Sequence, residues 1–459
     1  MRGTVNIDLN ERQHRPSVNA TISGAYKKGD IVEIEDAVLG DMYDGDDLWY
    51  KLKNGAFVWN GAVDVDVDCG RLSERDREHY LISYRNARPD GKPDMFDQDP
   101  ASSLFFMPVR LPVTEENIRL NHLLPGPFAD GVMRSIGKLT NKEQRHVFVY
   151  IHGFQPFSSL KLDLFSSFVQ NYLTHPKNKI AKVLFMVWPA QGLSRKRADD
   201  RAIQAGKDFT SNKLWAGFEE LSIRLRKEGK FLNLLAHSFG NQLLNGMVNP
   251  DNPLDTNNIP KDIFENVFLM APDVTHLTVR KMADPDDPAK FINGARLRNF
   301  FGREDTFNYD YSGLTRLAKN VHVFHDQFDY LLYASTKKFV GNRNIRRADD
   351  RLALTKDYRN LGNYGESQIL LPELLQAGFT FSNVQDLVSK TSPGNLCDFP
   401  FQKMKSGSAF EEEIKKVLSN ADYEGFGLLE ILFNRRSFEN YHKYVYTCKP
   451  VVDEVLRLL

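Results

Sequence analysis

Five short runs of almost uninterrupted apolar residues constrain the fold of this 459-residue chain more than any other feature. They cover residues 146–151, 183–188, 232–235, 267–270 and 321–324. Runs of this length are typical of strands that are buried on both faces, as in a parallel sheet with helices on either side. Because longer segments separate most of the runs, the pattern predicts an α/β domain built on a mostly parallel central sheet.

The segments around these runs complete the predicted sheet and its helices. Residues 79–84 and 104–109 predict two early strands that can pair antiparallel, and residues 384–388 predict the last strand of the sheet. Apolar residues at helical spacing predict one helix over residues 160–169 and another over residues 214–225.

Charge balance and cysteine usage disfavour several classes of protein. With 60 Lys and Arg against 60 Asp and Glu, the chain has no global positive field that would gather phosphates, so no nucleic-acid partner is expected. The first 13 residues are too charged for a secretory signal, and no apolar run approaches the 18 or so residues of a membrane span. Cys69, Cys397 and Cys448 are far apart and lack metal-ligand spacing, which favours a cytoplasmic location without a structural metal.

Residues 1–68 differ in composition from the rest of the chain and predict a separate domain. They hold 13 of the 60 acidic residues but only 7 of the 60 basic ones. Short β-type runs alternate with turn residues between residues 31 and 59, which predicts a small all-β barrel. The alternating Val and Asp residues of 63–68 lack the glycine and terminal Glu of a calcium loop, so we interpret them as an edge strand or linker. We place a linker at 69–78 and a second domain at 79–459.

Residues 232–244 have the pattern of a nucleophile elbow, a sharp turn between a strand and a helix that presents a serine. A mostly aliphatic strand leads to Ser238, and an apolar helix start follows it. Ala236 and Gly240, two positions before and after Ser238, are small enough to let strand and helix approach closely, although glycine is more usual at the first position. We therefore predict Ser238 as a nucleophile.

A second candidate element lies where the run 146–151 ends in His152, Gly153 and Phe154. Acyl transfer needs two N–H donors aimed at the developing oxyanion. We assign these donors to the backbone of Phe239, which follows the nucleophile, and to that of Phe154. We interpret His152 as a brace for this loop, with a catalytic role as the alternative.

The segments VYIHGF, LFMVWPAQG, LLAHSFGNQLL and VFLMAPDV resemble the α/β-hydrolase superfamily and are closest to bacterial predicted hydrolases of the DUF900 type. The resemblance extends over residues 80–459 and implies an α/β-hydrolase fold with insertions around 275–320 and 336–440. It also implies an acid and a base that follow the serine in the chain, at Asp329 and His442. The N-terminal segments KKGDIVEI, DLWYKL and NGAFVW resemble a bacterial SH3-type barrel, for which a protein or peptide ligand is one candidate.

The resemblance implies a Ser-His-Asp mechanism that needs no cofactor and no metal. His442 would take the proton of Ser238 and later protonate the leaving group, while Asp329 would hold the correct imidazole tautomer. An acyl-enzyme would form and then be hydrolysed.

A rival pair follows from the residues alone. A strand over 296–301 would be followed by Asp305, and His325 comes directly after the run 321–324. This pair also keeps the order serine, acid, base along the chain. We favour Asp329 and His442, because the rival pair leaves His442 and the final helix unexplained.

Two further segments allow both a functional and a structural interpretation. The charged run 195–201 follows a strand end, where it could meet an anionic substrate group or form a solvated face. The apolar stretch 425–433 could be a lid over an acyl pocket or part of the core.

These observations predict a serine hydrolase that cleaves a carboxylic ester or related acyl bond of a small molecule or lipid. The alternative is a non-catalytic interaction protein, in which the hydrolase scaffold and the SH3-like barrel both act as binding surfaces.

Overall fold

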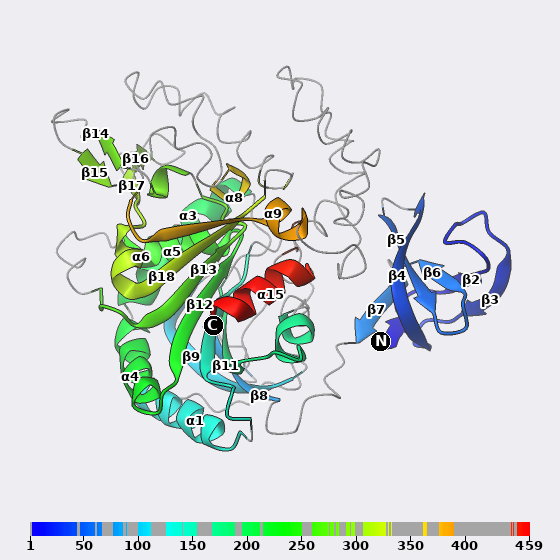
Figure 1. Cartoon of the computed structure of the whole chain (residues 1–459), viewed down its shortest axis with the longest axis horizontal. Coiled ribbons are helices and arrows are strands. Elements are labelled where there is room, and N and C mark those ends of the chain that lie inside the picture. The colour runs from blue at the N-terminus through cyan, green and yellow to red at the C-terminus, as the bar shows by residue number, and fades with distance from the viewer. Residues whose placement is uncertain are drawn as a thin grey trace. The chain divides into compact units, whose positions relative to one another are not determined.

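The structure is a computed structural model, and its described residues, which Figure 1 colours by residue number, fall into two compact units. The described residues are 2–43, 46–59, 62–66, 77–85, 89, 100–111, 125–139, 141–153, 168–188, 195–211, 214–249, 259–274, 276–279, 281–283, 291–293, 295–298, 306–326, 329, 332, 361–364, 376–389, 442, 444 and 448–459. The first unit contains Met1–Arg71, Ser166–His175 and Gln385–Leu458, and the second contains Leu72–Phe165, Pro176–Val384 and Leu459.

A curled antiparallel sheet begins the first unit (Figure 1). Its strands are β1 (Arg2–Val5), β2 (Leu9–Arg12), β3 (Ile22–Tyr26), β4 (Ile31–Tyr43), β5 (Asp46–Leu52), β6 (Phe57–Trp59) and β7 (Val63–Asp66). They lie in the order β3-β2-β6-β5-β4-β1-β7, so β7 is an edge strand. Val32, Ile34 and Val58 are at most 2% exposed and form part of its core. The prediction of a small all-β domain is confirmed, and the curled sheet is compatible with an SH3-like barrel.

An eight-stranded sheet forms the centre of the second unit. Its strands are β8 (Glu78–Arg85), β9 (Pro100–Arg110), β10 (His146–Ile151), β11 (Ile180–Val187), β12 (Phe231–His237), β13 (Phe264–Met270), β18 (Ala318–His325) and β19 (Phe379–Asn383). They lie in the order β19-β18-β13-β12-β10-β11-β8-β9. Every neighbouring pair is parallel except β8 and β9, which pair antiparallel at the edge. The predicted α/β fold with a mostly parallel sheet is confirmed.

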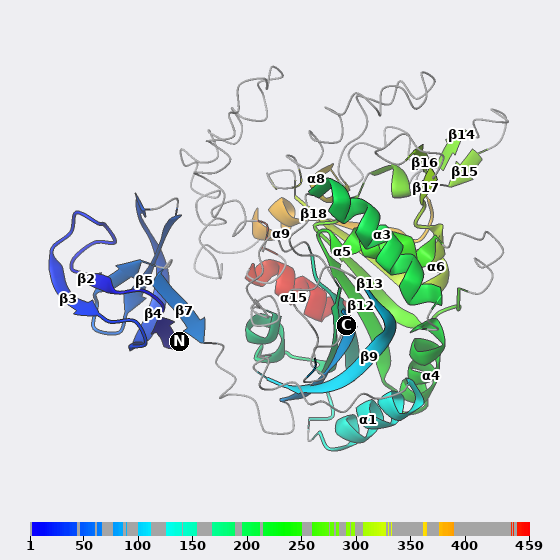
Figure 2. The same cartoon turned by 180° about the vertical axis from the view of Figure 1, so that it is seen from behind.

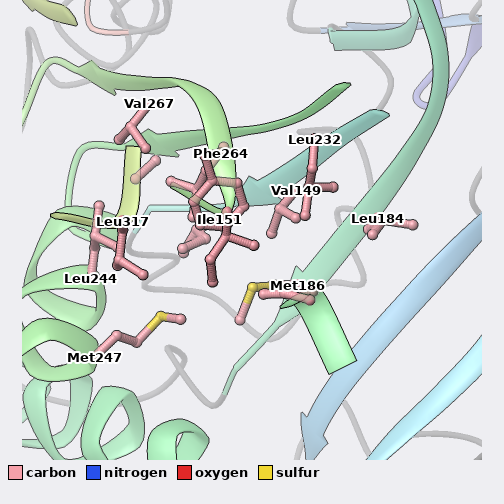
Figure 3. Close-up of a cluster of buried hydrophobic side chains, with 14 of the residues drawn as sticks. Val149, Ile151, Leu184, Met186, Leu232, Leu244, Met247, Phe264, Val267 and Leu317 are labelled. Carbon is pink, nitrogen blue, oxygen red and sulfur yellow. The ribbon is translucent and has the colours of Figure 1, made fainter. Parts of the chain in front are cut away.

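Among the described residues, five helices each contribute two or more buried side chains to one hydrophobic core with this sheet, and Figure 2 shows several of them across its face. They are α1 (Pro125–Gly137), α3 (Arg195–Ser211), α4 (Leu214–Lys227), α5 (Gly240–Val248) and α6 (Ser312–Leu317). The helical spacing of Phe218, Leu221 and Leu225 places all three in this core, fully buried. Figure 3 shows part of the cluster, including Val149 and Ile151 from β10.

Smaller elements follow β13. They are η6 (His276–Val279), a hairpin of β14 (Lys281–Ala283) and β15 (Phe291–Asn293), a second hairpin of β16 (Ala295–Arg298) and β17 (Thr306–Tyr309), and the short helix α8 (Leu361–Tyr364). Strand β16, which overlaps the predicted strand 296–301, therefore pairs with β17 and not with the central sheet.

The last predicted strand, 384–388, is wrong. Strand β19 ends at Asn383, and Val384–Ser389 form helix α9. The apolar positions Val384, Leu387 and Val388 are three and four residues apart, which is the spacing of a helix face and not that of a strand.

Two further elements of the first unit contact each other. They are the π-helical turn η4 (Val169–Leu173) and the last helix, α15 (Lys449–Leu458). The His175 imidazole lies 3.2 Å from the Asp453 carboxylate, which joins the two segments. Among the described residues, no helix is both long and apolar enough to cross a membrane.

Candidate active site

Ser238 lies in a tight turn between strand β12, which ends at His237, and helix α5, which begins at Gly240. Its φ of 52° is in the left-handed region, which costs an L-residue roughly 1–2 kcal/mol. Hydrogen bonds hold this conformation. The main-chain N–H of Ser238 donates to the Met270 carbonyl at 2.8 Å, and its carbonyl accepts from Asn241 and from the main-chain N–H of Asp273 at 3.2 Å.

Glycines allow the end of β10 to lie against this turn. A Cβ at Gly240 would come within 2.8 Å of the carbonyl oxygens of Ile151 and His152, closer than real Cβ contacts occur. A Cβ at Gly153 would lie 3.0 Å from the Ser238 Cβ. Gly153, two residues after the end of β10, therefore lies directly beside the serine side chain.

The turn after the neighbouring strand β13 is also strained. Ala271 has a φ of 45°, and the same turn supplies both the Met270 carbonyl and the Asp273 N–H that bond to Ser238. Asp273 is 1% exposed, so a carboxyl group lies buried in the segment bonded to the serine. Asp273 was not among the predicted site residues, although it follows an apolar strand within the motif VFLMAPDV.

Two carboxyl groups follow strand β18, at Asp326 and Asp329, and both are fully buried. Asp329 donates its main-chain N–H to the Asp326 carbonyl at 3.1 Å, and its Oδ1 accepts from the Leu332 N–H at 3.3 Å. Asp326 was missed by the sequence analysis. Its signal was its position directly after a buried parallel strand, where active-site groups collect in open α/β sheets.

Segment 361–362 joins the ends of β13 and β18. The Gly362 carbonyl accepts from the Asp326 N–H at 2.8 Å, and the Gly362 N–H donates to the Pro272 carbonyl at 3.0 Å. A Cβ at Gly362 would overlap the Leu332 side chain and lie 2.7 Å from the main chain of Ala271. Main-chain hydrogen bonds thus connect the turn beside Ser238 to the segment that carries Asp329.

His152 is 3% exposed and bonded to the main chain. Its Nδ1 lies 2.7 Å from the Gly153 carbonyl oxygen, and its Nε2 accepts from the main-chain N–H of Trp188 at 3.4 Å. The Trp188 indole stacks on the His152 ring at a centroid distance of 5.6 Å and on the Phe239 ring at 6.2 Å. These contacts are those of a loop brace.

Of the remaining predicted site residues, the two histidines are described in the structure and the other two residues are not. His325 ends strand β18, is 7% exposed and packs edge-on against Phe381. His442 is also 7% exposed and belongs to the first unit. Phe154 and Asp305 lie outside the described residues.

The two segments with open interpretations receive no assignment. The charged run 195–201 forms the start of helix α3, and the apolar stretch 425–433 lies outside the described residues. Within the described part of the chain, no group of three or more His, Cys, Asp or Glu side chains could hold a metal ion.

A mostly parallel sheet with a left-handed serine between a central strand and the following helix, and with acids after the next two strands, defines an α/β hydrolase. Residues 132–352 match the family described as "Alpha/beta hydrolase of unknown function (DUF900)". This part of the chain is therefore a domain of that family, and the prediction of an α/β hydrolase is confirmed. A comparison with curated proteins finds no match to the chain.

Proposed function

We propose that this protein is a serine hydrolase that cleaves a carboxylic ester or related acyl bond of a small molecule or lipid. The observation that carries the proposal is the left-handed conformation of Ser238 at the end of a buried parallel strand. Strained conformations of this kind persist where the surroundings enforce them, and they cluster at active sites. Five described neighbours of the turn enforce it here: Ile151, His152, Asn241, Met270 and Asp273.

In the proposed reaction, the Ser238 hydroxyl attacks the acyl carbonyl while neutral His442 removes its proton. The carbonyl oxygen becomes an oxyanion that accepts from the N–H groups of Phe239 and Phe154. His442 then returns the proton to the leaving alcohol, and Asp329 stabilises the imidazolium in between. Water, activated by His442, releases the acid from Ser238 and restores the enzyme.

A fluorophosphonate probe tests whether Ser238 is activated, because only an activated serine reacts with it quickly. We expect the full chain to be labelled and Ser238→Ala to remain unlabelled. Ser135→Ala is the matched control, since Ser135 is a buried serine on α1 whose hydroxyl has no hydrogen-bond partner among the described residues, and it should label like the parent. Equal labelling of the parent and Ser238→Ala removes Ser238 from the mechanism.

The acid and base are tested by turnover of one activated ester. We expect His442→Ala to turn over the ester as slowly as Ser238→Ala, because the members of a triad act as a unit. Asp329→Asn should also lose most of the turnover, because the imidazole would no longer be held in the correct tautomer. His325→Ala and Asp305→Asn should be mild. A severe His325→Ala with a normal His442→Ala would replace the assigned pair by Asp305 and His325.

The acids that the sequence analysis missed belong in the same series. Asp326→Asn and Asp273→Asn each replace one buried carboxyl group beside the site by an amide. If Asp329 is the orienting acid, both variants should keep most of the turnover. A loss confined to Asp326→Asn would move the acid three residues closer to the end of β18.

A further inference from the structure

Asn241, in the first turn of helix α5, donates to two main-chain carbonyls at the elbow. Its Nδ2 lies 2.9 Å from the Ser238 carbonyl oxygen and 3.1 Å from the Ala236 carbonyl oxygen. Because both carbonyls can only accept, the side-chain atom that faces them is the nitrogen, and its two hydrogens serve one carbonyl each. One amide group thus joins the end of strand β12 to the turn that carries the nucleophile.

The oxygen of the same amide shows what the side chain contributes. Asn241 has no exposed surface, and its Oδ1 accepts no hydrogen bond from the described residues. Buried polar atoms without a partner are rare in folded proteins, and each calls for a reason. Both hydrogens of Nδ2 are used while Oδ1 is not, so the contribution of this side chain lies in the two bonds that it donates.

Tyr311 fixes the main chain of Asn241. The fully buried Tyr311 hydroxyl donates to the Asn241 carbonyl at 2.8 Å, and the Tyr311 main-chain N–H donates to the Thr278 carbonyl at 2.8 Å. Burial raises the pKa of Tyr311 well above its ordinary value, so the hydroxyl keeps its proton and remains a donor. Asn241 therefore has little freedom to carry its amide away from the elbow.

The bond to the Ser238 carbonyl also sets the direction of the Phe239 N–H, the assigned oxyanion donor that follows the nucleophile. Both groups belong to one planar peptide, and in a trans peptide the C=O and the N–H point in opposite directions. Three groups donate to this carbonyl: Nδ2 of Asn241, the main-chain N–H of Asn241 at 3.1 Å and that of Asp273 at 3.2 Å. Of these three donors, only Nδ2 can be removed by a substitution that leaves the main chain unchanged.

We propose that Asn241 is a positioning residue for acyl transfer, whose amide holds the left-handed Ser238 and thereby directs both the Ser238 hydroxyl and the Phe239 N–H. The proposal rests on the proposed serine hydrolase function. Asn241 takes no part in bond making or proton transfer, and its effect passes through the peptide between residues 238 and 239. Removing one oxyanion donor typically costs about 10²–10³ in kcat, so misdirecting one should approach that loss.

The test measures kcat and KM of the full chain on 4-nitrophenyl acetate for three substitutions at position 241. Asn241→Leu keeps the branching of the side chain and removes both donors, and Asn241→Ala removes them with a smaller side chain. Asn241→Ser restores one donor, because a serine hydroxyl in a helix reaches the carbonyl three residues earlier, here that of Ser238. We expect Leu and Ala to lower kcat about a hundredfold with little change in KM, and Ser to recover about tenfold over Ala.

Asn245→Ala and Asn245→Ser are the matched controls, because Asn245 is a fully buried amide one turn further along α5, and both should keep the parental kcat. A purely structural role of Asn241 predicts kcat losses that follow the melting temperature and equal kcat in Asn241→Ala and Asn241→Ser, and that result overturns the proposal. Parental kcat in Asn241→Ala also overturns it. If Asn241→Leu does not fold, the Ala and Ser pair still decides.

Labelling of the parent separates this inference from the proposed function. A parent that labels at Ser238, together with a kcat that is indifferent to Asn241, overturns the inference alone. Failure of the parent to label at Ser238 overturns the proposed function itself and this inference with it.

Discussion

Ser238 and Ala271 are two of four non-glycine residues with positive φ in the described part of the chain. Ser238 follows strand β12 and Ala271 follows the neighbouring strand β13. The N–H and the carbonyl of Ser238 both form hydrogen bonds with the turn that contains Ala271. Strain at two contacting positions is retained only when the surrounding packing and hydrogen bonds outweigh it. The nucleophile is therefore held in place at some cost in stability.

This strain predicts that Ser238→Gly is more stable than Ser238→Ala. Glycine adopts a positive φ without steric cost, whereas alanine keeps the strain, so Ser238→Gly should have a free energy of unfolding higher by about 1 kcal/mol. Urea unfolding of both variants measures the difference. Ser222 in helix α4 is the matched control, and there the glycine variant should be the less stable of the two. Equal stability of both Ser238 variants would show that the turn is unstrained.

At the scale of elements, the elbow depends on a close crossing of helices α3 and α5. A Cβ at Gly206 of α3 would overlap the Leu243 carbonyl oxygen of α5, and a Cβ at Gly246 of α5 would overlap the Ile203 carbonyl oxygen of α3. The two backbones are thus in direct contact. Because α5 begins two residues after Ser238, a displacement of this helix would reach the nucleophile.

We expect Gly206→Ala to lower the free energy of unfolding by about 3 kcal/mol or more, because backbone atoms have to move apart. Its rate of labelling at Ser238 should also fall. Gly137→Ala is the control, since no atom of the described part of the chain is recorded within 4 Å of the Cβ that it adds, and its stability should stay within about 1 kcal/mol of the parent. Denaturant unfolding and probe labelling of both variants check this. Parental stability in Gly206→Ala would refute the direct contact.

A ladder of polar side chains crosses four parallel strands. Asn233 Nδ2 lies 3.1 Å from the ring of His146, and Asn266 bonds to Asn233 at 3.0 Å and to His322 at 3.3 Å. Burial lowers the pKa of His146 to about 4, and Lys179 and Arg145 act in the same direction. His146 is therefore neutral in the folded protein at pH 7.

The lowered pKa predicts how stability depends on pH. The unfolded chain binds a proton at His146 below about pH 6.5, whereas the folded chain does so only below about pH 4. The contribution of His146 to the free energy of unfolding is therefore fully present above pH 6.5 and is lost progressively as the pH falls to 4. At about 1.4 kcal/mol per pH unit the loss is roughly 3 kcal/mol. Urea unfolding at pH 7, 5.5 and 4.5 should show a smaller decline for His146→Asn. The exposed His14→Asn should decline like the parent, and parallel curves for all three proteins would contradict the prediction.

At the scale of the whole molecule, the seven-stranded sheet has cores of its own. Val5, Val32, Ile34, Leu52, Val58 and Val63 form one cluster, and Trp49, Trp59 and Ala62 form a second. Both clusters consist of residues from the N-terminal β domain alone. Among the described residues, no member of either cluster lies outside residues 1–68. Residues 1–71 share a compact unit with residues 166–175 and 385–458, so the separate domain at 1–68 stays a prediction.

We expect the chain without residues 1–68 to label at Ser238 as quickly as the full chain, because none of the residues assigned to the reaction lies in that part. Probe labelling of the truncated and the full chain, with circular dichroism to confirm folding, measures this. A folded but unlabelled truncated chain would show that the β domain belongs to the catalytic unit.

The sequence predicts the central strands well, because residues buried on both faces leave short runs that are almost entirely apolar. The prediction fails where the role of a residue depends on contacts with residues that are distant in the chain. His152 accepts a hydrogen bond from the main chain of Trp188, and the strained turn at Ala271 is bonded to Ser238. Neither contact leaves a local sequence pattern. The strand predicted at 384–388 fails for a different reason, since its three apolar residues, Val384, Leu387 and Val388, have the spacing of a helix face.

The placement of Gly362 has a consequence for redesigning this protein. The segment predicted as an insertion at 336–440 contains helix α8 and strand β19, and Gly362 fits between the ends of β13 and β18 where no larger residue has room. Excising the whole segment would therefore remove Gly362 from between two strand ends and an edge strand from the eight-stranded sheet. A minimal version has to be trimmed on either side of 361–364 and 376–383, with short connections that keep both pieces in their places.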